Sequence, residues 1–372
     1  MRDGHLVIDS DGHIVEPPDL WDRYIDLEFY GVRPICDPTT MGIEVMGHRM
    51  SRSYENAAYG EAVTSTWKQR HASAEQRSYD AASQLAFMDS EGIDSMVLYP
   101  SRGLYAASVA DLDGRVASAI CRAYNRWLHD FCSLDPDRLV GVALVGLQDP
   151  GLAAVEARHA VEDLGMRGVM IRPNPYAGRN LHDAAYDGFY SEMERLDVPL
   201  ATHEGCGVWM PEYGLDRFSE HIAWHAMCHP MEQMGAVLSF TLGGVCERHP
   251  SLRIAILEAG GTWLPYWLSR LDGHVEWLKD VEARHLTMLP SEYFKRQMWI
   301  GFEPEEPGLR GLVDYIGADR LLWASDYPHP DAHFPGVLEE LFETESLRDE
   351  ERWAILRDNP QALYGLGAPA VV

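Results

Sequence analysis

Basic residues are scarce in this sequence. The chain of 372 residues has 31 Lys and Arg against 58 Asp and Glu, and its formal net charge is −27 at pH 7. Proteins that bind nucleic acid need a basic surface, so this charge balance argues against a nucleic-acid partner. Large polyanions are disfavoured for the same reason. Small molecules of low charge are therefore the better candidate partners.

Long apolar runs are also missing. No stretch approaches the roughly 18 consecutive apolar residues of a membrane span. The start, MRDGHLVIDSDGH, lacks the basic and apolar segments of a secretory leader. The 6 cysteines are scattered without a C-x-x-C pair, which favours buried thiols in a reducing compartment. These features predict a cytoplasmic protein without a membrane contact.

Short apolar and β-branched runs alternate with longer amphipathic segments, a pattern typical of βα units and a parallel sheet. With 46% hydrophobic residues, the chain can bury a large core. Eight is the strand number of a closed (β/α)8 barrel, so the sequence predicts an α/β fold, a TIM barrel in one domain over residues 1–372. The eight runs lie at residues 6–13, 95–100, 139–147, 168–173, 198–205, 252–261, 297–304 and 320–328.

The segments between these runs carry apolar residues at spacings of three and four, which predicts helices. Two intervals are too long for a simple connection, namely residues 14–75 and 206–245. They follow the first and fifth predicted strands, where insertions of a barrel build over the active site. The predicted helices cover residues 84–92, 113–134, 151–164, 186–196, 262–280 and 335–345.

Metal-ligand side chains occur at the ends of three predicted strands. Asp11 and His13 are two residues apart on the first strand and so point to the same side. His203 ends the fifth strand, and Asp326 ends the eighth. Carboxylates and imidazoles suit Zn, Fe or Mn in an open site with room for water. The alternative is that His203 is a core histidine and Asp326 caps a helix.

These motifs together resemble the amidohydrolase superfamily of metal-dependent barrels. The most similar branch is the amidohydrolase-2 group related to aminocarboxymuconate semialdehyde decarboxylase. The resemblance implies that Asp11, His13, His203 and Asp326 are metal ligands, and that Asp326 also handles protons. It covers nearly the whole chain, in the segments IDSDGHIVEPPDLW, GVMIRPNP, PLATHEG, ERHPSLRIAILEAGGTWLPYWLSRLD, LLWASDYPHPD and DNPQALYGL.

One position departs from this branch. Its decarboxylases usually have a His after strand six, where this chain has Glu258 in the segment LEAGG. An anionic carboxylate beside a substrate carboxylate is unfavourable unless it is protonated or bound to metal. Glu258 is interpreted as an additional metal ligand or a partner of the ligands, as a general acid or base, or as a strand-end Glu paired with an Arg.

The number of metals depends on three further residues. Superfamily members with two metals usually bridge them through a Lys or Glu on strand four, where this chain has Arg172, so one metal is expected by default. His229 lies four residues after His225, on one helical face, and is interpreted either as a second-metal ligand with Glu258 or as a pocket-lining residue. Arg172 is expected to clamp a substrate carboxylate or carbonyl, or to neutralise the acidic barrel mouth.

The main functional prediction is a metal-dependent hydrolase of an ester, thioester, lactone or amide, in which metal-activated water attacks a carbonyl. The alternative is a metal-dependent non-oxidative decarboxylase of an aromatic or unsaturated carboxylic acid, and a ligand-binding barrel without turnover is a third hypothesis. Zn is the first choice of metal, with Fe or Mn as alternatives and one or two ions per chain.

The resemblance also implies a homodimer. The expected catalytic residues are Asp326, Glu258, His229 and Arg172, and His329 is a weaker pocket candidate.

Overall fold

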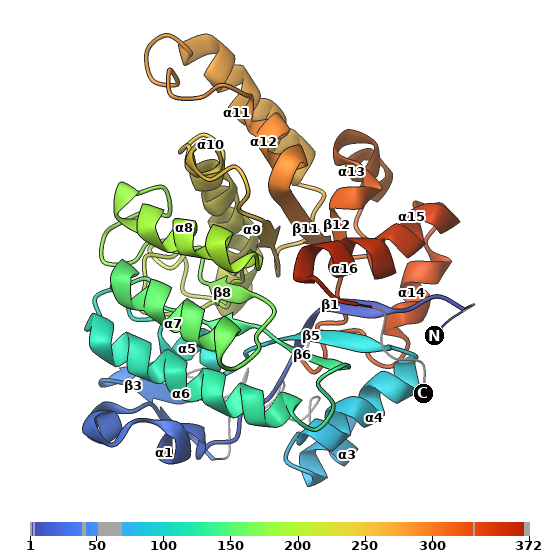
Figure 1. Cartoon of the computed structure of the whole chain (residues 1–372). Coiled ribbons are helices and arrows are strands. Elements are labelled where there is room, and N and C mark those ends of the chain that lie inside the picture. Colours follow the sequence, from blue (N-terminus) through green and yellow to red (C-terminus); the bar gives the residue numbers. More distant parts are fainter. Residues whose placement is uncertain (1, 3, 39–41, 51–68, 330–331, 368–372) are drawn as a thin grey trace.

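The computed structural model describes residues 2, 4–38, 42–50, 69–329 and 332–367 (Figure 1). Its main strands are parallel and form a sheet with the order β1-β5-β6 and a sheet with the order β12-β11-β10-β9-β8-β7. The strands are β1 (Ile8–His13), β5 (Ser95–Tyr99), β6 (Leu139–Gly141), β7 (Ala143–Leu144), β8 (Val169–Ile171), β9 (Leu200–Thr202), β10 (Ile254–Ile256), β11 (Met298–Phe302) and β12 (Leu321–Trp323).

The two sheets adjoin at both of their edges. At one edge only Val142 separates β6 from β7, so these two strands occupy a single barrel position. At the other edge the Asp326 N–H donates to Asp11 O at 3.2 Å, and the His13 N–H donates to Tyr327 O at 2.7 Å. The strand ladder is interrupted at these junctions, but the order of the strands is that of an eight-stranded TIM barrel. The predicted fold class is confirmed.

Most of the strands other than β1 are apolar on both faces because helices cover the outside of the barrel. Every residue of β5, β8, β9, β10 and β12 is buried. Aspartates begin several of the helices: Asp80, Asp113 and Asp149 each accept hydrogen bonds from N–H groups of the first turn. The longer helices are α4 (Ala81–Glu91), α6 (Gly114–Cys132), α7 (Pro150–Glu162), α8 (Asp187–Leu196), α9 (His221–Phe240), α11 (Leu264–Leu278), α12 (Pro290–Gln297), α13 (Leu309–Ile316) and α14 (Val337–Glu343).

All eight predicted strand positions contain a strand, but most of the strands are shorter than predicted. The run at 252–261 contains β10 of three residues, because the chain leaves the barrel wall after Ile256. The polar side chains lie in the residues that directly follow these short strands. Shorter helical segments are α1 (Leu20–Tyr24), η1 (Leu27–Val32), α3 (Ala72–Gln76), α5 (Gly103–Ala106), η3 (Ala184–Tyr186), α10 (Val245–Arg248), η4 (Ala318–Arg320), α15 (Asp349–Trp353), η5 (Ala354–Asp358) and α16 (Asn359–Tyr364).

The first long interval, residues 14–75, contains α1, η1 and an antiparallel sheet, while its residues 39–41 and 51–68 lie outside the described residues. The second, residues 206–245, consists of a loop followed by α9. Figure 1 shows α11 and α12 projecting from the body of the molecule. Within the described residues, no helix combines the length and apolar character that a membrane crossing requires. The small sheet consists of β2 (Ile35–Cys36), β3 (Ile43–Val45) and β4 (His48–Arg49).

Candidate active site

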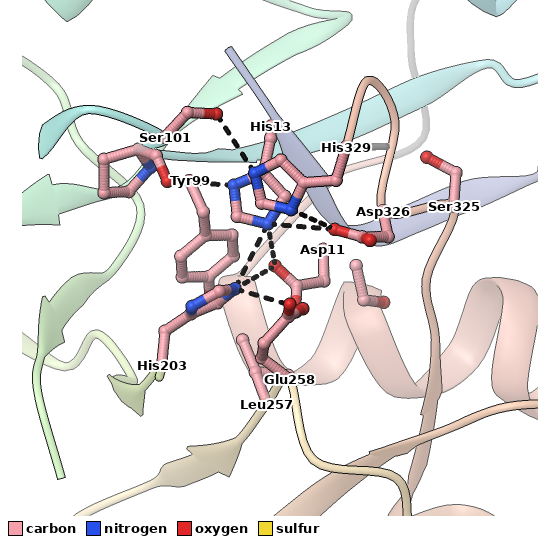
Figure 2. Close-up of polar contacts among 12 residues, drawn as sticks. Asp11, His13, Tyr99, Ser101, His203, Leu257, Glu258, Ser325, Asp326 and His329 are labelled. Carbon is pink, nitrogen blue, oxygen red and sulfur yellow. Dashed lines mark hydrogen bonds and ion pairs between the residues drawn. The ribbon is translucent and has the colours of Figure 1, made fainter. Parts of the chain in front are cut away.

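The sequence-predicted metal ligands come together at the carboxyl ends of the strands. Asp11 and His13 belong to β1, His203 follows β9 directly, and Asp326 lies three residues after β12. Glu258 joins them from the loop after β10. Figure 2 shows the side chains of these five residues pointing toward a common centre. Because the carboxyl ends of all barrel strands open on one face, residues far apart in sequence meet there.

The ligand atoms of this strand-end cluster (Asp11, His13, His203, Glu258 and Asp326) are close together. The Nε2 atoms of His13 and His203 are 3.1 Å apart. Asp11 Oδ1 lies 3.7 Å from His13 Nε2 and 3.5 Å from His203 Nε2. Glu258 Oε2 is 3.6 Å from His203 Nε2, and Asp326 Oδ1 is 3.4 Å from His13 Nε2. These spacings are those of donors arranged around one small cation.

His13 and His203 direct the lone pairs of their Nε2 atoms toward each other. His13 Nδ1 contacts Pro100 O at 2.9 Å, and His203 Nδ1 contacts Glu204 O at 2.7 Å. A carbonyl oxygen only accepts, so each Nδ1 carries the proton and each neutral ring presents an unprotonated Nε2. Two such lone pairs at close range repel each other unless a cation lies between them.

Two further observations agree with a metal at this centre. Burial lowers the pKa of His13 well below its usual range, with the imidazoles of His329 and His203 adding to the effect. A neutral imidazole is the form that binds metal. Asp11 Oδ1 is buried and has no hydrogen-bond donor among the described residues. The donor set therefore fits a divalent cation held by nitrogen and oxygen.

Exposure divides the cluster into an inner and an outer part. The side chains of His13 and His203 are 0% exposed and that of Asp11 is 4% exposed. Glu258 and Asp326 are 17% and 21% exposed and line a cavity of about 440 Å³. The inner residues are thus placed to hold a metal, and the two outer carboxylates are placed to contact a substrate. The cavity has room for a small organic acid.

The two outer carboxylates share an unusual backbone conformation. Glu258 has a backbone φ of 57° and Asp326 has a backbone φ of 53°. These values lie in the left-handed region, which residues other than glycine rarely adopt. Such strain costs on the order of 1 kcal/mol or more and persists where the surrounding structure imposes it. Here the strained turns project both carboxylates into the cavity, which is typical of a functional site.

His329 is a closer part of the site than the sequence indicates. Its Nδ1 lies 2.7 Å from Asp326 Oδ1, and its Nε2 lies 3.1 Å from Ser101 Oγ. The imidazole also stacks on the ring of His13, with centroids 3.8 Å apart. Ser101 is positioned by Glu16, whose carboxylate accepts hydrogen bonds from the N–H groups of residues 101–103. Sequence reasoning missed Ser101 and this role of Glu16, because no spacing signal links the loop after β5 to β12.

Of the two roles predicted for Arg172, the contacts of its side chain fit the neutralising role better than the substrate clamp. It is 2% exposed and is absent from the described lining of the cavity. Its Nη2 lies 2.9 Å from Glu204 Oε1 and donates to Gly205 O at 2.8 Å. Its other nitrogens donate to Leu104 O and to the Asn174 side chain. Because its donors are committed to protein atoms, Arg172 fixes the segment that follows His203.

His229 lies in a different ligand group from the one predicted. It lines the same cavity as Glu258. Among the described residues, however, its ring nitrogen lies within 4.8 Å of the sulfur atoms of Cys206 and Cys228. The Glu258 carboxylate instead lies within 4.8 Å of the ligand atoms of Asp11, His13 and His203. The structure therefore does not support the predicted second metal shared by His229 and Glu258. The cause is the direction of α9, which carries His229 toward the loop after β9.

Comparisons with known proteins match most of this chain. The family model described as amidohydrolase matches residues 8–366. Gamma-resorcylate decarboxylase of Rhizobium sp. (strain MTP-10005) is 28% identical over 306 residues, which are 76% of this chain and 86% of that protein. The 2-amino-3-carboxymuconate-6-semialdehyde decarboxylase of Dictyostelium discoideum is 25% identical over 67% of this chain and 72% of that protein. A 2-keto-4-carboxy-3-hexenedioate hydratase of Sphingobium sp. (strain NBRC 103272 / SYK-6) is 24% identical over 76% of this chain and 82% of that protein.

Solved structures share the fold. An amidohydrolase from Mycobacterium avium subsp. paratuberculosis K-10 superposes with a TM-score of 0.78 at 20% identity and covers 99% of each chain. A dihydroxybenzoic acid decarboxylase from Polaromonas sp. JS666, with bound manganese and the inhibitor 2-nitroresorcinol, has a TM-score of 0.66 at 20% identity and covers 97% of each chain.

These relatives contradict the predicted hydrolase and favour the alternative, decarboxylation. The physical reason lies in Glu258. The preference for hydrolysis over decarboxylation depends on an anionic Glu258 beside the substrate carboxylate, but Glu258 Oε2 lies 3.6 Å from His203 Nε2 within the strand-end cluster. A cation held by that cluster offsets the charge of Glu258, so the electrostatic objection to decarboxylation loses its force.

Proposed function

Because the chain belongs to the amidohydrolase family, we propose that it is a metal-dependent decarboxylase of a small aromatic or unsaturated carboxylic acid. The observation that carries this proposal is the strand-end cluster, with two unprotonated Nε2 atoms 3.1 Å apart beside two carboxylates that face a cavity. The curated decarboxylases that match most of the chain support the choice of reaction.

Asp11, His13 and His203 would hold one divalent cation, and Glu258 and Asp326 lie close enough to add ligands. When bound, the cation supplies positive charge that holds the carboxylate oxygens of the substrate and offsets the negative cluster. Zinc, iron and manganese all accept these nitrogen and oxygen donors. Manganese, which the Polaromonas structure contains, is our first choice for assays.

Asp326 is placed to deliver the proton that decarboxylation requires. In the reaction, the bond between the carboxyl group and its carbon breaks, CO₂ leaves, and the electron pair stays on that carbon, which then takes a proton. Asp326 lines the cavity, and its Oδ1 lies 2.7 Å from His329 Nδ1. Ser101, 3.1 Å from His329 Nε2, fixes the orientation of the imidazole. The protein thus holds Asp326 in one position for proton transfer.

Glu258 is the second group that faces the substrate. It occupies the position where decarboxylases of this branch usually have His, and it lines the cavity. The described lining of the cavity includes carboxylates and imidazoles but neither Lys nor Arg. This charge distribution disfavours substrates with several anionic groups. We therefore propose a substrate with a single carboxylate, and its hydroxyl groups would bond to the imidazoles.

The test is an assay of CO₂ release by the purified protein loaded with Mn²⁺, across gamma-resorcylate, other hydroxybenzoates and unsaturated monoacids. We expect CO₂ from at least one compound, and we expect the release to stop in Asp326→Asn and after treatment with a chelator. No CO₂ from the whole panel with Mn²⁺, Zn²⁺ or Fe²⁺ would overturn the proposal. So would water addition to an unsaturated acid without CO₂, the kind of reaction that the name of the Sphingobium relative indicates.

The remaining predictions about partners and location stay predictions. The homodimer also stays a prediction. Light scattering of the purified protein measures the oligomeric state directly.

A further inference from the structure

A second group of metal-ligand side chains lies beside the loop that follows His203. Cys206 belongs to that loop, and Cys228 and His229 belong to α9. All three are buried, and their sulfur and ring nitrogen atoms lie within 4.8 Å of one another. His221, in the first turn of α9, adds a fourth candidate, because its Nδ1 lies 3.9 Å from Cys206 Sγ. We name Cys206, Cys228 and His229 the sulfur cluster.

We propose that the sulfur cluster is a second metal site, built for a thiophilic divalent cation such as Zn²⁺, with His221 as the candidate fourth ligand. Thiolate and imidazole are the ligands of structural zinc sites, with bonds of about 2.3 Å to sulfur and about 2.0 Å to nitrogen. Those bonds place tetrahedral donor atoms about 3.5 Å apart. Donors already within 4.8 Å of one another reach that spacing through small side-chain rotations.

The loop that carries Cys206 is held rigidly on both sides. Before it, the Gly205 carbonyl accepts a hydrogen bond from Arg172 at 2.8 Å. After it, the N–H groups of Gly207 and Val208 donate to the Glu212 carboxylate at 3.1 and 3.2 Å. A cysteine fixed between two anchored neighbours loses little conformational entropy on binding a metal. This preorganisation distinguishes the cluster from cysteines that merely pack in a core.

The sulfur cluster is separate from the strand-end cluster in both residues and chemistry. Among the described residues, no ligand is shared between the group of Asp11, His13 and His203 and the sulfur cluster. Soft sulfur donors select zinc or other thiophilic ions, whereas the nitrogen and oxygen donors also suit manganese. A metal on the sulfur cluster would tie the loop after His203 to α9, whose His225 and His229 line the 440 Å³ cavity. Its role is therefore to brace one wall of the substrate cavity.

The test is a metal count on the full-length reduced protein saturated with Zn²⁺ and freed of excess ion. We expect two ions per chain in the wild type and one in Cys206→Ser and in Cys228→Ser. The matched control is Cys132→Ser, because Cys132 is also buried but lies at the end of α6, outside the cluster. This control should keep two ions. His13→Asn should lose the other ion, the one at the strand ends.

Cobalt gives a readout that depends on neither activity nor the count. Wild type and His13→Asn loaded with Co²⁺ should both show the near-ultraviolet charge-transfer band of cobalt bound to thiolate, and Cys206→Ser should lack it. One ion per chain without this band in the reduced wild type would overturn the proposal. A Cys206–Cys228 disulfide that persists in the protein isolated with reductant, detected by intact mass, would also overturn it. If the serine variants do not fold, titration of the metal-free wild type with Co²⁺ still decides the question.

Discussion

The two ligand clusters of this molecule are built in different ways. The strand-end cluster takes Asp11 and His13 from one barrel strand and its other members from residues just beyond three other strands. The sulfur cluster takes Cys206 from a loop and its other two members from one turn of α9. The strands β9 and β10 are fixed by ladders on both sides, and β1 and β12 by a ladder on one side and by backbone hydrogen bonds at their junction, so side chains at these strand ends keep their positions without a ligand. The loop with Cys206 and helix α9 are joined only by side-chain and backbone contacts, without a strand ladder. A bound metal would therefore stabilise the packing of the loop against α9.

The difference predicts that the strand-end cluster serves catalysis and the sulfur cluster serves stability. A charged group that moves protons must face the substrate, as Asp326 and Glu258 do in the cavity. The sulfur donors of the other cluster are buried, with Cys206 and Cys228 5% and 0% exposed. Variants of the first cluster should therefore change kcat, and variants near the second should change the free energy of unfolding.

The largest effect is expected from Asp326→Asn. This change removes the proposed proton donor while preserving the size of the side chain, so kcat should fall by about 10³-fold. Steady-state kinetics on the substrate identified by the CO₂ assay measures the loss, and circular dichroism checks the fold. Asp314→Asn is the matched control, because Asp314 is an exposed residue of α13, and it should keep full activity. A decrease in kcat of less than tenfold for Asp326→Asn would show that another group supplies the proton.

Much of the strand-end cluster can be predicted from the sequence. Asp11 and His13 are two apart on a strand, and His203 and Asp326 end other strands, so the convergence of strand ends in a barrel brings them together. The sulfur cluster offers no such signal. Cys206 lies far from Cys228 in sequence, and the two meet only because α9 packs beside the loop after β9. That packing depends on the tertiary fold of residues 206–245, which periodicity alone does not give.

The role of Arg172 is left open by the sequence for the same reason. A strand-four arginine at the barrel mouth suggests a substrate clamp, but the role of its guanidinium depends on which acceptors surround it. The structure supplies Glu204, Gly205, Leu104 and Asn174, and these occupy its donors. The sequence shows that an arginine is present, but it does not show which carbonyl groups the fold places beside its guanidinium.

Arg172→Met tests whether one segment supports both clusters, because Glu204 and Gly205 lie between His203 and Cys206. The change leaves the buried Glu204 carboxylate and two carbonyls without their cation, so we expect a loss of about 3 kcal/mol in the free energy of unfolding. Urea denaturation at pH 7 measures it.

Two controls frame that result. Arg115→Met removes an exposed ion pair with Glu28, 3.2 Å long, and should cost less than about 1 kcal/mol. The double variant Arg172→Met with Glu204→Gln should recover part of the loss, because the buried charge is then absent. If Arg172→Met is as stable as Arg115→Met, the segment between the clusters is held by other contacts.

Glu258→Gln sharpens the contrast within the strand-end cluster. The inner ligands Asp11, His13 and His203 remain, so the metal count should not change, whereas kcat should fall by about 10-fold to 100-fold because a charged neighbour of the ligands is lost. The pH profile of kcat separates the two roles of Glu258: loss of one limb indicates proton transfer, and an unchanged shape indicates a ligand. Glu258→His, which restores the residue usual in this branch, should keep more activity than Glu258→Gln. Loss of the metal in Glu258→Gln would contradict the division into inner and outer residues.

The smallest effect concerns Glu232, which lies on α9 just beyond the sulfur cluster. Burial raises the pKa of Glu232 from 4.5 to about 7, although its Oε1 accepts a hydrogen bond from the Tyr213 N–H at 2.7 Å. Between these two pH values the folded protein holds a proton that the unfolded chain releases, so the free energy of unfolding should fall as the pH rises from 4.5 to 7.

Glu232→Gln keeps the oxygen that accepts from Tyr213 and removes the titration. In metal-free protein at pH 8 this variant should be more stable than the wild type by about 2 kcal/mol, and at pH 4.5 the two should be nearly equal. Urea denaturation of both proteins at the two pH values measures the difference. Equal stability at pH 8 would mean that Glu232 is ionised in the folded protein at little cost. The surroundings of the sulfur cluster would then be as well solvated as the cavity, and the contrast between the two regions would rest on their ligands alone.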